Sequence, residues 1–223
     1  MIEKILPAAA ASAEAFTDPS DVTLFPQEAA LVGRAVEKRR REFATGRSCA
    51  HAALAALGVP PAPILSGERG APMWPYGIVG SITHCAGYRA AAVAIDDQLR
   101  AIGLDAEPNE EMPEGVLNAV SLPAERARLA DLAAAAPGTS WDRLLFCAKE
   151  STYKAWFPLT RRWLGFADAD ITINLDGTFQ SRLLVSLDTA QPVGPREPPP
   201  PSFAGRWLAA DGLLLAAIIV PAQ

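Results

Sequence analysis

Apolar residues recur along this chain at two periods, one typical of helices and one typical of strands. A spacing of three and four residues marks an amphipathic helix, and alternation or a short apolar run marks a strand. Capping residues and prolines limit the helical stretches. Three helices are predicted: residues 27–57 with an interruption near Gly46, residues 123–136, and residues 141–157 between an N-cap at Ser140 and a stop at Pro158.

Short apolar runs between turn residues predict strands in two groups. Seven are expected, at residues 78–83, 90–95, 101–106, 171–175, 182–187, 205–209 and 213–220. Asp176-Gly177 and Asp211-Gly212 are typical hairpin turns, and two further tight turns are expected after residues 83 and 95. The proline-rich stretch 191–201 favours a stiff, exposed excursion.

The order of these elements is helix, strands, helices, strands, which predicts an α+β fold. We expect two similar halves, each with helices on a small antiparallel sheet, divided near Pro108 into residues 1–108 and 109–223. No clear internal sequence repeat accompanies this division.

Composition narrows the class of protein. Half of the 223 residues are apolar and the net charge is -5, which favours one large core and argues against general nucleic-acid binding. The apolar run 213–220 is too short to span a membrane, and Pro7 and Glu3 argue against a signal peptide. The three cysteines show neither disulfide nor zinc spacing, so we expect buried free thiols and a cytoplasmic location.

Carboxylates and a lysine suggest chemistry on phosphates. Asp105 and Glu107 share one face of a predicted strand, and Glu150 and Lys154 share one face of a predicted helix. Three hard oxygen ligands suit Mg²⁺, and a lysine beside them suits a phosphate. A polar strand edge and a surface ion pair are the alternatives, although the aromatic residues around Lys154 argue against an exposed helix face.

A basic cluster offers a second anion site. Six cations fall between residues 34 and 47: Arg34, Lys38, Arg39, Arg40, Arg41 and Arg47. Such a run is either a solvated helix face or a phosphate site. His84 follows Ser81 and Thr83 after a glycine, so these side chains either bind an anion or serve the structure alone.

Together these segments resemble the 4′-phosphopantetheinyl transferases of the Sfp type, closest to the actinobacterial, PptT-like branch. The resemblance extends from about Pro26 to Val220. It is carried by six motifs in order: KRRREFATGRSCA, PILSGERGAPMWP, GSITHC, IGLDAEP, SLPAER and FCAKESTYKAWFPLTRRWLGF.

The resemblance implies an enzyme that transfers 4′-phosphopantetheine from coenzyme A to a serine of an acyl or peptidyl carrier protein and releases adenosine 3′,5′-bisphosphate. It implies two pseudo-symmetric halves with the active site at their junction, and a monomer. By this likeness Asp105, Glu107 and Glu150 hold Mg²⁺ or Mn²⁺, with Glu150 and Lys154 as catalytic residues. The remaining substrate contacts implied are Lys149 and Lys154 to the phosphates, Arg39, Arg47, Ser66, Arg69, Thr83 and His84 to the nucleotide end, and Trp163 beside the pantetheine.

This chain departs from its relatives at two positions. They often carry lysine in place of Ser66 and arginine in place of His51. The loop from Arg161 to Phe166 is a candidate dock for an acidic carrier helix, or simply a packed loop. A magnesium-dependent phosphohydrolase or nuclease and a non-catalytic coenzyme A-binding module are the alternative functions.

Overall fold

A computed structural model describes residues 1–186 and 198–222 of the chain. The contacts between residues divide the chain into two compact units, Met1–Arg100 with the last residues, and Ala101–Pro221. This division falls inside a strand, earlier than the predicted boundary at Pro108. Asp105 and Glu107 therefore belong to the same unit as Glu150, and not to the N-terminal half as predicted.

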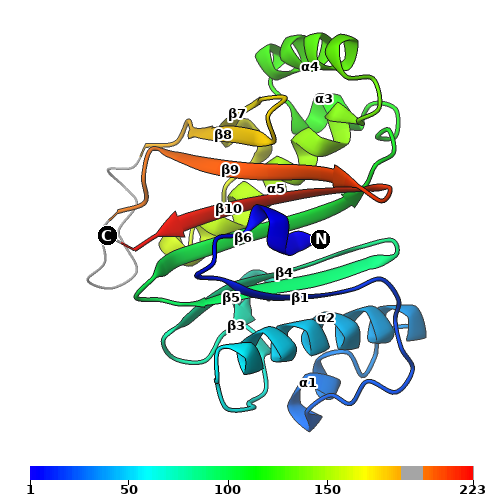
Figure 1. Cartoon of the computed structure of the whole chain (residues 1–223), viewed down its shortest axis with the longest axis vertical. Helices are drawn as coiled ribbons and strands as arrows, with labels where there is room; N and C mark the ends of the chain where they lie inside the picture. Colours follow the sequence, from blue (N-terminus) through cyan, green and yellow to red (C-terminus); the bar gives the residue numbers. More distant parts are fainter. Residues whose placement is uncertain (187–197, 223) are drawn as a thin grey trace. The chain divides into compact units, whose positions relative to one another are not determined.

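Unit 1 is a three-stranded antiparallel sheet in the order β1-β5-β4, packed against one long helix, α2 (Figure 1). Its elements are η1 (Ile2–Ile5), β1 (Ala11–Ala15), α1 (Pro26–Leu31), α2 (Glu37–Ala56), β2 (Leu65–Ser66), η2 (Glu68–Gly70), β3 (Pro72–Met73), β4 (Ile78–Cys85) and β5 (Tyr88–Ile95). The small pair β2-β3 encloses the loop at residues 67–71. Ala50, Leu54 and Val93 lie in the core between α2 and the sheet.

Unit 2 is a five-stranded sheet in the order β6-β10-β9-β8-β7, with α5 packed on it (Figure 1). Its elements are β6 (Leu99–Pro108), α3 (Val116–Val120), α4 (Pro123–Ala135), α5 (Trp141–Thr160), η3 (Phe166–Asp168), β7 (Ala169–Ile173), β8 (Thr178–Leu183), β9 (Ser202–Ala210) and β10 (Leu213–Pro221). The fully buried Trp156 and Leu144 of α5 pack against strand residues that include Leu214.

Most predicted elements are confirmed, and the α+β class with them, but several boundaries were wrong. The first helix breaks at residues 32–36 and not at Gly46, which lies inside α2, where even an added Cβ would make only ordinary contact. Helix α5 continues through Pro158 to Thr160, although the proline has no backbone N–H to donate to residue 154. The strand predicted at 182–187 lies at Thr178–Leu183, directly after the turn at Gly177.

The turns were predicted with mixed success. Asp211 and Gly212 both have positive φ, as the expected two-residue hairpin between β9 and β10 requires. The turn after residue 95 does not close a hairpin, because β5 and β6 enter different sheets. Strand β1 was not predicted. The proline-rich segment falls mainly on residues 187–197, outside the described residues.

Burial agrees with most of the compositional reasoning. The run 213–220 is the buried strand β10, and within the described residues no helix is long and apolar enough to cross a membrane. All three cysteines are free thiols; Cys49 and Cys147 are buried, whereas Cys85 is partly exposed, contrary to the prediction.

Candidate active site

Strand β6 and helix α5 approach each other closely at Gly103. A Cβ atom at this position would lie 2.0 Å from the Ser151 carbonyl oxygen, so only glycine fits here. Two residues along the strand, the buried Asp105 accepts a hydrogen bond from Lys154 Nζ at 2.7 Å. The structure therefore brings together the predicted strand carboxylate and the predicted helix lysine.

One face of α5 carries the polar side chains toward this contact. Arg143, Cys147, Glu150 and Lys154 follow one another at spacings of four, three and four residues, which is one helix face. Arg143 Nη1 lies 3.2 Å from Glu107 Oε2. Sequence reasoning missed Arg143, although its distance of two helical turns from Glu150 placed it on the same face.

The three carboxylates share one electrostatic neighbourhood. Burial and the Asp105 charge raise the pKa of Glu107 above its ordinary value of 4.5, and the same two causes raise the pKa of Glu150. Burial alone would lower the pKa of Lys154, but the nearby acidic groups, Asp105 foremost, together outweigh it and the net shift is upward. The site therefore holds its lysine charged and disfavours three simultaneous carboxylate charges.

No formed metal centre is visible in this arrangement. Within residues 1–186 and 198–222, no group of three or more His, Cys, Asp or Glu side chains is placed to hold an ion. Asp105 and Glu107 face the cations Lys154 and Arg143 instead.

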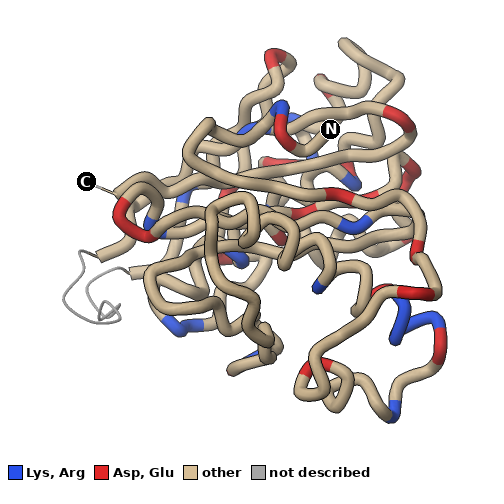
Figure 2. The backbone as a smooth tube through the Cα atoms, turned by 60° about the horizontal axis from the view of Figure 1, so that its bottom comes forward, with Lys and Arg blue, Asp and Glu red and all other residues tan. Residues whose placement is uncertain are grey.

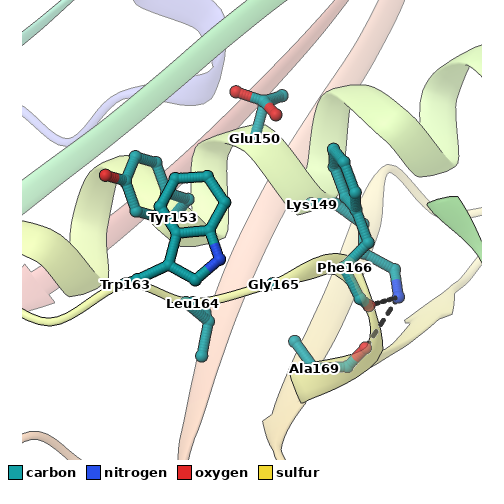
Figure 3. A pocket seen from close by; sticks show the side chains of 8 residues that line it. All are labelled: Lys149, Glu150, Tyr153, Trp163, Leu164, Gly165, Phe166 and Ala169. Atoms are coloured by element: carbon teal, nitrogen blue, oxygen red, sulfur yellow. Dashed lines mark hydrogen bonds between the residues drawn. The ribbon is translucent and has the colours of Figure 1, made fainter. Parts of the chain in front are cut away.

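Lys149 points to a different place from its neighbour Glu150. Its Nζ donates to the carbonyl oxygens of Phe166 and Ala169 at 2.6 and 2.7 Å (Figure 3). It also pairs with Glu125 Oε2 at 2.9 Å. The Glu125 carboxylate is itself buried and accepts the backbone N–H of Ile171 at 2.7 Å. These partners are structural, so contact between Lys149 and the phosphates stays a prediction.

A pocket lies beside this helix face, between α5 and the segment that follows it. It is lined by Lys149, Glu150, Tyr153, Trp163, Leu164, Gly165, Phe166 and Ala169. The rings of Tyr153 and Trp163 lie side by side with centroids 5.0 Å apart, and Trp163 is 59% exposed (Figure 3). Leu164 is buried in the core and offers little surface to the predicted carrier dock, which itself stays a prediction.

The predicted nucleotide contacts lie in unit 1. Arg39 Nη1 donates to His84 Nε2 at 2.8 Å, while the buried Arg47 reaches Ser66 Oγ at 3.4 Å and covers the Phe43 ring. Burial lowers the pKa of the Arg47 guanidinium, and the nearby Arg39 charge adds to this shift. Figure 2 marks the Lys and Arg positions of this basic run in blue along the backbone.

The other two predicted nucleotide contacts occupy contrasting positions. Thr83 is buried within β4, at 2% exposure. Arg69 lies in the loop between β2 and β3 with a left-handed φ of 54°. Non-glycine residues rarely adopt this conformation, so the surrounding loop must hold the Arg69 backbone in it.

Comparisons with known proteins identify the family of this chain. The family model of the 4′-phosphopantetheinyl transferase N-terminal domain matches residues 27–94, and that of the 4′-phosphopantetheinyl transferase superfamily matches residues 101–197. The chain is 52% identical to the 4′-phosphopantetheinyl transferase PptT of Mycobacterium tuberculosis, over 99% of this chain and 98% of the relative. It is 54% identical to Npt of Nocardia iowensis (98% and 99% covered) and 54% identical to Svp of Streptomyces mobaraensis (100% and 90%). The chain belongs to the 4′-phosphopantetheinyl transferase superfamily.

Proposed function

We propose that this protein transfers 4′-phosphopantetheine from coenzyme A to a serine of a carrier protein and releases adenosine 3′,5′-bisphosphate. The observation that carries the proposal is the 2.7 Å hydrogen bond from Lys154 to Asp105. Glu107 and Glu150 are close enough for the Asp105 charge to raise their pKa values. Acids and a lysine so arranged suit a pyrophosphate and its metal ion.

The donor set fits Mg²⁺, with Mn²⁺ as an alternative. Asp105, Glu107 and Glu150 bring three negative charges, and Lys154 and Arg143 oppose them. Burial and the Asp105 charge both raise the pKa values of the two glutamates, and a bound divalent cation would favour their ionised forms. When bound, the ion would polarise the phosphoryl oxygens.

Glu150 and Lys154 take the two catalytic roles in this proposal. A serine hydroxyl becomes an effective nucleophile when a base accepts its proton, and Glu150 is the carboxylate that we assign to this role. The serine oxygen forms a bond to the β-phosphorus while the bond to the α-phosphate oxygen breaks. Lys154, held charged beside Asp105, neutralises the negative charge that builds on the leaving phosphate.

Unit 1 binds the nucleotide end in this proposal. Arg39 is held by His84 and Arg47 by Ser66, and guanidinium groups suit phosphate oxygens. Ser66 and Arg69 border the adenine and the 3′-phosphate. In unit 2, the pocket beside Trp163 suits the pantetheine arm, because its aromatic wall leads to Glu150.

The carrier is the protein partner, and a cytoplasmic monomer remains our expectation. Arg161 is exposed at the end of α5 with its guanidinium over the Phe157 ring, and the exposed Trp163 lies two residues on. These two side chains suit an acidic carrier helix with an apolar edge.

Intact-mass measurement tests the proposal. Protein, coenzyme A, Mg²⁺ and an apo carrier are mixed, and we expect the carrier to gain the mass of one phosphopantetheine group. The Glu150→Gln variant should lose about 10²–10⁴-fold in rate. Glu114→Gln, at an exposed carboxylate, is the matched control and should transfer normally.

Each alternative function gives a distinct result in this assay. Phosphate release without carrier modification would identify a phosphohydrolase. Coenzyme A binding without turnover would identify a binding module. Normal transfer by Glu150→Gln would refute the assignment of the base.

A further inference from the structure

A fully buried carboxylate in unit 1 has no role in the function proposed above. Glu28 of α1 is 0% exposed, yet it accepts hydrogen bonds from the backbone N–H groups of Ile64, at 2.8 Å, and Phe25, at 3.2 Å. Its Oε1 also lies 2.8 Å from His51 Nε2 of α2. A buried carboxylate is costly unless several donors satisfy it, so this one fixes all three segments that it joins.

The joined segments meet beside the nucleotide loop. Arg47 and His51 are four residues apart and therefore share one face of α2. Arg47 contacts Ser66 directly, and His51 contacts the backbone of Ile64 through the Glu28 carboxylate. Two parallel links thus hold the start of the loop against the helix that carries the arginines.

Short elements make these links necessary. Helix α1 has six residues and β2 has two, and neither length is stable by itself. The loop that follows holds Arg69 in its left-handed conformation. The Glu28 bond to Ile64 thus adds a second fixed point, beside the Arg47–Ser66 contact, from which the loop places Arg69 relative to Arg47.

We propose that Glu28, with His51, is a positioning residue that sets the Ser66–Arg69 loop for recognition of the 3′-phosphate of coenzyme A. This inference rests on the proposed function. It assigns to Glu28 a role in substrate discrimination and not in the chemical step. His51 is the side-chain partner of Glu28, at a position where an arginine could pair with the same carboxylate.

Unit 2 contains a matched structural control. Glu125 is also the third residue of a helix that begins with proline, and it accepts the N–H groups of Leu122 and Ile171 beside Lys149. Glu28 and Glu125 are thus the same motif, residues 25–28 and 122–125, used once in each unit. Only the copy in unit 1 adjoins the nucleotide loop.

The test compares coenzyme A with 3′-dephospho-coenzyme A as substrates of Glu28→Gln. We expect the KM for coenzyme A to rise about tenfold, the size of a lost charged hydrogen bond, with kcat nearly unchanged. The KM for 3′-dephospho-coenzyme A should not change. Glu125→Gln should leave the ratio of the two KM values as in the wild type, and His51→Arg should preserve it.

Several outcomes would overturn the inference: an equal rise in both KM values, a loss confined to kcat, or the same altered ratio in Glu125→Gln. If Glu28→Gln fails to fold, the same two KM values are measured for His51→Gln. That variant removes the imidazole partner of Glu28 and leaves the bonds from the Ile64 and Phe25 backbone N–H groups in place. A wild-type protein without transferase activity would refute the proposed function instead. In that case calorimetry still tests Glu28, by comparing the affinities for adenosine 3′,5′-bisphosphate and for 5′-AMP. Glu28→Gln must lose the wild-type preference for the bisphosphate, or the inference fails.

Discussion

Gly103→Ala should damage both the stability and the activity of this enzyme. The added Cβ would lie 2.0 Å from the Ser151 carbonyl oxygen and 2.7 Å from the Ala155 nitrogen, both of which are backbone atoms of α5. Carbon and oxygen normally approach no closer than about 3.3 Å, so α5 must move away from β6 by about 1.3 Å, the difference between the two distances.

Such a displacement has two measurable costs. Overpacking in a core typically costs about 1–3 kcal/mol, and a rigid helix backbone favours the upper end of this range. The shift also separates Asp105 from Lys154, now 2.7 Å apart, and a misplacement of about 1 Å reduces rates by about 10²-fold. We therefore expect the free energy of unfolding to fall by about 3 kcal/mol and kcat/KM to fall by about 10²-fold.

Urea denaturation gives the free energy of unfolding, and carrier modification followed by mass spectrometry gives kcat/KM. Gly138→Ala is the control, because no atom lies within 4 Å of its added Cβ and the backbone there is ordinary. If Gly103→Ala matched Gly138→Ala in both measurements, the close approach of β6 and α5 would not support the site as we describe.

Three further predictions follow from the site and its surroundings. Lys154→Ala should reduce kcat/KM by about 10²-fold or more, since it removes the cation beside Asp105; a value within about twofold of wild type would contradict its catalytic role. Removing Mg²⁺ with a chelator should abolish carrier modification. Restoring Mg²⁺ should raise the melting temperature of the wild type more than that of Asp105→Asn, because an ion that binds the native state stabilises it. Equal shifts in melting temperature would exclude Asp105 as a ligand. Burial raises the pKa of the Cys49 thiol to about 11 and the pKa of the Cys147 thiol well above its ordinary value. At neutral pH a thiol reagent should therefore modify only Cys85 in the native protein and all three thiols in denaturant. Rapid modification of Cys147 in the native protein would show that α5 is not packed as described.

The strongest local patterns in the sequence predicted the fold well. The alternation on β6 and the four-residue spacing on α5 placed Asp105 and Lys154 on faces that the structure brings together. These periodicities are properties of single elements and need no knowledge of their partners. The strand at Thr178–Leu183 has polar residues at its exposed alternate positions, so its sequence is a weaker strand signal than the more apolar residues that directly follow it.

Features that depend on tertiary contact were missed. The paired motif at residues 25–28 and 122–125 is a proline followed two residues later by glutamate, which is too short to stand out as a repeat. Only the burial of both glutamates shows that they are equivalent. The position of Lys149 depends likewise on carbonyl groups of Phe166 and Ala169, which no spacing in the helix could indicate.

The passage from one compact unit to the next occurs within β6, and this determines how the chain can be divided. A cut after Pro108 would leave β6 on the first fragment, while the four strands that complete its sheet would remain on the second. Each fragment would then expose an unsatisfied strand edge that the other fragment complements. The two pieces should therefore reassemble when co-expressed, which makes this enzyme a natural scaffold for a split reporter whose signal is carrier modification.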